Sequence, residues 1–168
     1  VAARAAEDVN RAYIKALGLT PGIWIAPHGQ SNEDVVKKNP GVFMLKPDGT
    51  SASESWEGKW LVDPSVPETR NYLNELFTMM TKWGYEYFKI DGQTVVTAQY
   101  QQKASFIKNP GDMEAWYRNT LDTIRNAIGP KRYLLGCWGI PLEGVGYMNG
   151  SRTGGDVIEL ARLAHAFG

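Results

Sequence analysis

Two short segments of the sequence carry residue types that could do chemistry together. In "YEYFKIDG", residues 85–92, Lys89 and Asp91 lie at the end of an apolar, strand-like run. Side chains two positions apart share one face of a strand, so this lysine and aspartate would be neighbours. In "SRTGGDV", Arg152 and Asp156 are four residues apart in a glycine-rich segment. Each segment could therefore present a carboxylate beside a positive charge.

Both segments also have a purely structural interpretation. Asp91-Gly92 is a common turn pair, so Lys89 and Asp91 could form a solvated strand end. Asp156 directly precedes a helical pattern and could be its N-cap, with the glycines permitting a tight turn. The segments indicate a site only if the fold brings them together.

Composition bounds the class of protein. A chain of 168 residues with 43% hydrophobic and 21% charged residues is typical of one globular domain. The 18 basic and 18 acidic residues cancel without long runs of one sign, so we expect no nucleic-acid or membrane partner. A single cysteine without CxxC or HExxH motifs predicts no structural metal site. The cellular compartment stays open.

Hydrophobic periodicity predicts alternating helices and strands. Ser31, the Ser65/Glu68 capping box and Asp112 are the expected helix N-termini, and Gly129 is an expected stop. Residues 41–64 read as an excursion over one end of the domain, with an Asp48-Gly49 turn, and residues 93–111 as a loop. The predicted strands are 22–27, 85–90 and 132–138, and the predicted helices are 2–17, 31–41, 65–83, 112–129 and 157–167.

This alternation, with strands too apolar for a half-exposed sheet, favours a parallel α/β fold. In such folds the chemistry lies at the carboxyl ends of the strands, on the top face of a (β/α)8 barrel or in the crevice of an open sheet. Lys89, Asp91 and Cys137 all fall at such ends. Three or four strands cannot close a barrel of roughly 250 residues. We therefore expect residues 1–168 to be one partial catalytic domain, the central segment of a barrel, beginning within a helix already in progress.

Two carboxylates meeting at one barrel face suit glycoside hydrolysis. A retaining enzyme needs an ionised carboxylate as nucleophile and a protonated carboxyl as acid, roughly 5 to 5.5 Å apart. Lys89 would hold Asp91 ionised, while a partly shielded Asp156 could have a raised pKa.

At these residues the sequence resembles glycoside hydrolase families 27 and 36, the α-galactosidases and their relatives. "YFKID" resembles their nucleophile strand and "SRTGGDV" their acid/base segment. "GLTPGIWIAP", "VDPSVPETRNYL", "WGYEYFKIDG" and "LLGCWGIPL" follow the family's order, so the resemblance covers nearly the whole chain. It implies action on α-linked galactose or related sugars with retention, through a covalent glycosyl-aspartate on a (β/α)8 barrel, without metal or cofactor.

The resemblance also implies residue roles. Asp91 would be the nucleophile and Asp156 the acid/base, while Lys89 and Arg152 would bind sugar hydroxyls. Cys137 would lie near the C2 substituent of the sugar, where relatives carry glutamate, cysteine or a small residue. The choice between a 2-hydroxyl and an N-acetyl group stays open, and galactose specificity comes from the relatives alone.

Several aromatic side chains have two interpretations each. Trp138 could offer its ring face to the sugar or pack under a loop. Trp24 could contact substrate from its strand, although core packing is favoured. Trp56 and Trp60 could form a pocket wall. His28 could touch substrate, although capping a loop is favoured.

Other functions remain open at this stage. Lys89 at a strand end could form a Schiff base, as in aldolase chemistry. Galactosyl transfer, as in raffinose-synthase relatives, is a closer variant of hydrolysis. The chain could also be an inactive carbohydrate-binding fragment, because an incomplete barrel exposes strand edges. The expected partners are a carbohydrate substrate and, to cover those edges, the remaining barrel segments or a second copy.

Overall fold

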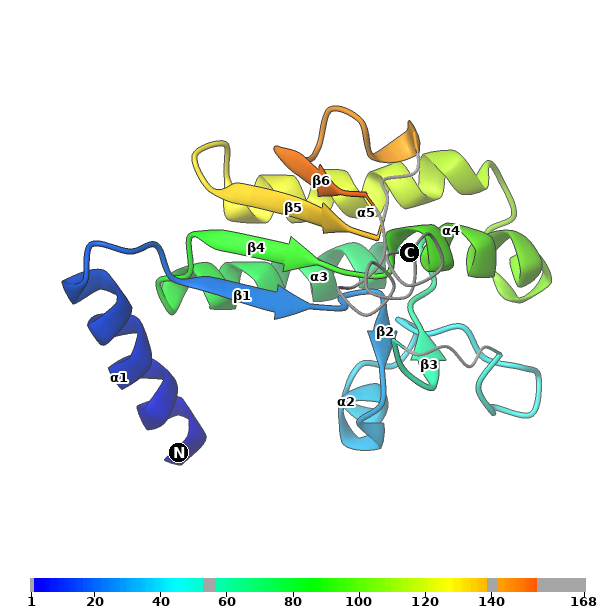
Figure 1. The fold of residues 1–168 in the computed structure, drawn as a ribbon. Helices are drawn as coiled ribbons and strands as arrows, with labels where there is room; N and C mark the ends of the chain where they lie inside the picture. Colours follow the sequence, from blue (N-terminus) through cyan, green and yellow to red (C-terminus); the bar gives the residue numbers. More distant parts are fainter. Residues whose placement is uncertain (1, 53–56, 139–141, 154–168) are drawn as a thin grey trace, which may run out of the picture.

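A computed structural model describes residues 2–52, 57–138 and 142–153. Its main sheet contains four parallel strands in the order β1-β4-β5-β6. The arrows of these strands point in one direction in Figure 1. The strands are β1 (Gly22–Ile25), β4 (Tyr87–Ile90), β5 (Tyr133–Cys137) and β6 (Gly150–Arg152). The predicted parallel α/β fold is confirmed, and the four strands form an open sheet.

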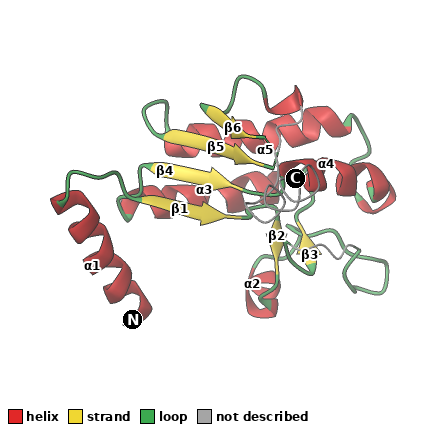
Figure 2. Cartoon of the chain, in the orientation of Figure 1, coloured by secondary structure: helices red, strands yellow, loops and turns green. Residues whose placement is uncertain are grey.

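One face of this sheet is buried under two helices, α3 (Pro67–Lys82) and α5 (Met113–Ile128). Both helices lie behind the strands in the view of Figure 2. Phe88, Ile90 and Leu134 point to this face and are fully buried. Burial stabilises each such side chain by roughly 1.5–3 kcal/mol. β4 lies in the middle of the sheet, between β1 and β5, and its apolar residues fit that position.

The opposite face carries the polar and aromatic residues of the same strands. Lys89 and Asp91 belong to this face because they alternate with the buried Phe88 and Ile90. Below them, Tyr87 of β4 stacks on Tyr133 of β5, with ring centroids 5.1 Å apart and nearly parallel planes. This face corresponds to the interior of a barrel wall.

The segment between β1 and α3, which includes the predicted excursion of residues 41–64, lies at the carboxyl ends of the strands. It contains β2 (Gly29–Gln30), α2 (Glu33–Lys38) and β3 (Trp60–Leu61), and β2 pairs with β3 in antiparallel fashion. These elements extend beyond the arrowheads of β1 and β4 in Figure 1. The Asp48-Gly49 turn is confirmed, since Asp48 Oδ1 accepts from Thr50 N at 2.9 Å.

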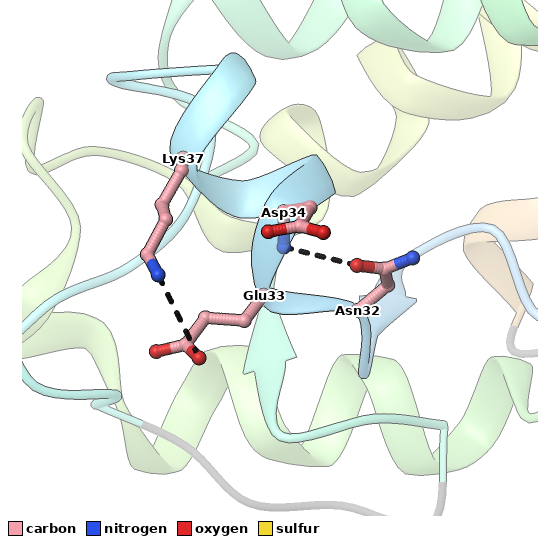
Figure 3. A network of polar contacts seen from close by, with 4 residues as sticks. All are labelled: Asn32, Glu33, Asp34 and Lys37. Atoms are coloured by element: carbon pink, nitrogen blue, oxygen red, sulfur yellow. Dashed lines mark hydrogen bonds and ion pairs between the residues drawn. The ribbon is translucent and has the colours of Figure 1, made fainter.

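Two expected helix caps are wrong. Asn32, not Ser31, caps α2, because its Oδ1 accepts from Asp34 N at 2.9 Å (Figure 3). Helix α3 begins after Val66 without a side-chain cap. Ser65 instead donates its hydroxyl to Asp63 Oδ1 at 2.6 Å, and this buried pair binds the backbone of residues 108–109.

The segment expected to be a loop is helical. Helix α4 (Gln93–Gln102) starts at Gly92, whose φ of 73° is left-handed, and a short 3-10 helix, η1 (Ala104–Phe106), follows. Gln93, Val96 and Tyr100 form its buried stripe. At α5 the predicted Asp112 N-cap and Gly129 stop are confirmed. The remaining described helices are α1 (Ala2–Ala16) and η2 (Leu142–Gly144).

The predicted last helix, residues 157–167, lies outside the described residues. Within the described part of the chain, no helix is long and apolar enough to cross a membrane.

Candidate active site

The candidate site is built on one row of residues at the carboxyl edge of the sheet. Asp91 directly follows β4, Cys137 ends β5 and Arg152 ends β6. The register pairs Ile90 with Gly136 and Cys137 with Arg152, so the three site residues are adjacent in the row. Parallel, in-register strands point the side chains of one row to the same face.

The Asp91 carboxylate is held by donors from both neighbouring strands. Trp24 of β1 donates its indole Nε1 to Oδ2 at 2.7 Å, and the Gly92 backbone N–H donates to Oδ1 at 2.8 Å. The Cys137 thiol of β5 also hydrogen-bonds to this carboxylate. The backbone is fixed as well, since Asp91 N donates to Ile25 O at 3.0 Å.

These contacts keep Asp91 ionised. Partial burial alone raises the pKa of Asp91, but the hydrogen bonds from Trp24, Cys137 and Gly92, followed by the charge of Lys89, outweigh it. The pKa of Asp91 therefore lies below its usual value. Lys89 acts in the expected direction, although hydrogen bonds to the charged form contribute more.

A second layer supports Asp91 from below. Gln93 donates its side-chain amide to Asp91 O at 2.7 Å, and the buried Tyr117 hydroxyl donates to Gln93 Oε1 at 2.7 Å. Tyr117 belongs to α5, so the backbone at the strand end is tied to the helix beneath the sheet. Such supporting contacts fix the geometry of a site residue.

One ionisable residue near Asp91 has no counterpart in the sequence-based prediction. Glu57, in the excursion, is only 8% exposed. Burial, followed by the nearby charge of Asp91, raises the pKa of Glu57 to about 8. No motif in "WEGK" predicts that Glu57 lies near Asp91, because this proximity depends on a backbone crossing between residues 29–30 and 57–58. Gly29 and Gly58, which permit the close crossing, are the signal that the sequence offers.

The tryptophans of the candidate list have distinct environments. Trp24 is 53% exposed and bound to Asp91, so the favoured core-packing role is wrong. Trp138 is 44% exposed beside Cys137, with a left-handed φ of 70° that is unusual for a bulky residue. Trp60 is buried in the core cluster, and its predicted place in a pocket wall stays a prediction.

His28 is part of the core. Its ring is fully buried, and its Nε2 lies 3.0 Å from Thr120 Oγ1 of α5. Because the Thr120 hydroxyl already donates to Tyr117 O, Nε2 is the protonated nitrogen of His28. The expected loop-capping role is therefore wrong. Asp156 and Trp56 lie outside the described residues.

The fold and the row of site residues define a class of protein: a segment of a parallel (β/α) barrel with a carboxylate at the carboxyl edge of a strand. The barrel is not closed by the described strands. In barrel enzymes this edge carries the active site.

Comparison with known proteins agrees with this class. No protein-family model matches the chain. It is similar to the α-galactosidase TtGalA of Thermus thermophilus, with a TM-score of 0.67 and 26% identity, covering 89% of this chain and 30% of that one.

Two further solved structures share the fold at 19% identity. The family 36 α-galactosidase AgaA of Geobacillus stearothermophilus has a TM-score of 0.62 over 92% of this chain and 22% of its own. The α-galactosidase of Lactobacillus brevis has a TM-score of 0.65 over 96% and 22%. This chain thus spans less than a third of each of these three proteins, and its fold is that of a barrel segment like the one in family 36 α-galactosidases.

Proposed function

We propose that this chain carries the catalytic centre of a retaining α-glycoside hydrolase that acts on α-galactosides or related sugars. The observation that supports it most is the Asp91 carboxylate, kept ionised at the carboxyl edge by Trp24, Cys137 and Gly92. Among the similar proteins, TtGalA has been solved with p-nitrophenyl α-D-galactopyranoside and with stachyose. A variant of AgaA has been solved with raffinose.

In the first step, a carboxylate oxygen of Asp91 attacks the anomeric carbon. The bond from that carbon to the glycosidic oxygen breaks, and the leaving oxygen takes a proton from Asp156. This gives a glycosyl ester on Asp91 and an ionised Asp156. In the second step, water attacks the anomeric carbon, its proton passes to Asp156, and the sugar leaves with Asp91 restored as a carboxylate.

The residues in and around this row bind the sugar. Lys89 and Arg152 offer charged donors to sugar hydroxyls, and Cys137 borders the C2 substituent. Trp138, with its exposed ring at the end of β5, provides an apolar surface for the sugar. Trp24 both contacts the sugar and holds the nucleophile by its hydrogen bond.

Covalent trapping tests the role of Asp91. The complete barrel protein is treated with an activated 2-fluoro-galactoside, and the labelled peptide is identified by mass spectrometry. We expect the label on Asp91. Label on another residue, or a borohydride-trapped Schiff base on Lys89, would replace this mechanism.

Substitutions test both carboxylates. Asp91→Ala should lower kcat/KM by about 10⁴-fold or more without unfolding the protein. Asp156→Ala should cost about 10²- to 10⁴-fold on substrates with poor leaving groups and less on activated ones. An equal loss on all substrates would remove Asp156 from the acid role.

Two assays separate the alternative functions. Product analysis with and without a sugar acceptor distinguishes hydrolysis from galactosyl transfer. Sugar binding without any turnover would favour an inactive carbohydrate-binding barrel.

A further inference from the structure

A cavity of about 350 Å³ lies beside the nucleophile position. Its walls come from residues 24–26 at the end of β1, residues 29–31 and Glu57. Trp24 lines this cavity and also donates to Asp91, so the cavity adjoins the proposed reaction centre. An exposed aromatic ring beside polar groups in a concave site suits a sugar ring.

Among the described residues that line this cavity, Glu57 is the only one with an ionisable side chain. Its position is fixed by a close crossing of two backbone segments. A Cβ on Gly29 would lie 2.6 Å from the backbone carbonyl carbon of Glu57, and one on Gly58 would lie 2.5 Å from Gln30 N. Because both positions are glycine, the segment carrying Glu57 packs directly onto β2.

The surroundings of Glu57 favour its neutral form. Asp91 faces Glu57 from the end of β4. Tyr117 of α5 and Tyr100 of α4 are also close to Glu57, whose negative charge would raise the pKa of each tyrosine. The buried His28 ring contacts both tyrosine rings and stays neutral, because burial lowers its pKa to about 3. The positive charges of Lys89 and Arg152 act on Cys137, where they oppose the rise in its pKa that burial causes.

A neutral carboxylic acid has a different capability from a carboxylate, because it donates a hydrogen bond as well as accepting one. Burial and the charge of Asp91 raise the pKa of Glu57 to about 8, so the acid form predominates at neutral pH. Next to an ionised nucleophile, such a group can hold a hydroxyl without adding a second negative charge.

We propose that Glu57 is a specificity-determining residue that binds a hydroxyl of a neutral sugar in the cavity beside Trp24. The inference rests on the proposed function for the nature of the ligand. It predicts a preference for neutral glycosides over uronic acids, because a carboxylate on the sugar would meet Asp91.

The test compares Glu57→Ala and Glu57→Gln in the complete barrel protein. The alanine variant should lose about tenfold in kcat/KM on raffinose at pH 6.5, mainly through KM. The glutamine variant keeps a donor and an acceptor and should recover part of this loss. Glu33→Gln is the matched control, since Glu33 is an exposed carboxylate on α2, and it should behave as wild type.

The pH profile is the second readout. Ionisation of Asp156, the proposed general acid, gives kcat/KM an alkaline limb in every variant, and wild type should show a second, steeper limb above about pH 8, as Glu57 ionises. The glutamine variant should lack this second limb. An alanine variant with wild-type KM, or a glutamine variant that keeps the second limb, would overturn the proposal.

Equilibrium binding separates this inference from the proposed function. Galactose binding by calorimetry should weaken in Glu57→Ala and not in Glu33→Gln. If wild type binds galactose but turns over no glycoside, the proposed function fails while the role of Glu57 is still measured. Equal binding by wild type and the alanine variant, or no binding by wild type, would refute the role of Glu57.

Discussion

Replacing Trp24 by phenylalanine should raise the pKa of Asp91. The substitution keeps a smaller aromatic ring on β1 and removes the indole N–H, whose nitrogen lies 2.7 Å from Asp91 Oδ2. A hydrogen bond to a charged acceptor contributes about 1.5–3 kcal/mol. The carboxylate loses one of the donors that keep its pKa low, so its charged form becomes less favourable.

The exposure of the site reduces this magnitude. Trp24 is 53% exposed, so water can take the place of the indole N–H at Oδ2. A net loss of about 1 kcal/mol remains, and 1.36 kcal/mol corresponds to one pKa unit. We therefore expect the pKa of Asp91 to rise by about half a unit to one unit. The Gly92 N–H and the Cys137 thiol still hold the carboxylate.

Two measurements follow this shift. The acid limb of kcat/KM on an aryl α-galactoside should move to higher pH by the same half unit to one unit, because Asp91 must be ionised to attack. Carbon-13 NMR of the Asp91 carboxyl gives the pKa without relying on turnover. Trp83→Phe is the matched control, because Trp83 packs against the core at the end of α3.

The reasoning would be refuted by an unchanged acid limb in Trp24→Phe. It would also be refuted by an equal shift in Trp83→Phe, because that shift would come from a general loosening of the fold.

The remaining predictions concern stability. Relative to wild type, Glu57→Gln should stabilise the protein by up to a few kcal/mol as pH rises from about 4.5 to about 8, because Glu57 loses its proton at lower pH in the unfolded chain than in the folded protein. Denaturant unfolding at pH 5 and pH 8 measures this, and the same stability difference between variant and wild type at both pH values would contradict it. Burial lowers the pKa of His28 in the folded protein to about 3, so the protein loses stability as pH falls below 6.5. His28→Phe should reduce the dependence of the unfolding free energy on pH in this range by up to about 1.4 kcal/mol per pH unit, and an unchanged dependence would contradict the burial of a neutral imidazole. Gly29→Ala should cost about 1–3 kcal/mol and weaken galactose binding, because its Cβ would displace Glu57. Gly49→Ala is the control: its Cβ would lie in open space at a φ of 80°, so it should lower stability without affecting galactose binding. Equal effects of the two substitutions on binding would show that the crossing at Gly29 does not position Glu57.

Local patterns were sufficient to predict the sheet and part of the site. Alternation of Lys89 and Asp91 with buried residues placed both on one face, and the parallel fold then placed Cys137 in the same row. Arg152, from the glycine-rich segment, ends the fourth strand of the sheet, β6. These predictions depend only on periodicity and on the direction of parallel strands.

Other features depend on contacts between distant segments. Helix α4 has only a short buried stripe that includes the polar Gln93, and its start at Gly92 reads as a turn. Ser65 has the right spacing for a capping box, but its hydroxyl bonds to Asp63 instead. Glu57 joins the site through the crossing at Gly29, which no sequence window contains.

The alternation along β4 has a consequence for mutational surveys of this protein. Ile90 is fully buried against the helices, and its immediate neighbours in the chain are Lys89 and Asp91. Truncating the Ile90 side chain would tilt the strand end and displace the carboxylate of Asp91, the proposed nucleophile, without altering any residue proposed to bind the sugar. A mutational screen that measures only loss of turnover will therefore identify buried apolar positions as well as active-site positions. Thermal unfolding of each variant is needed to distinguish the two groups.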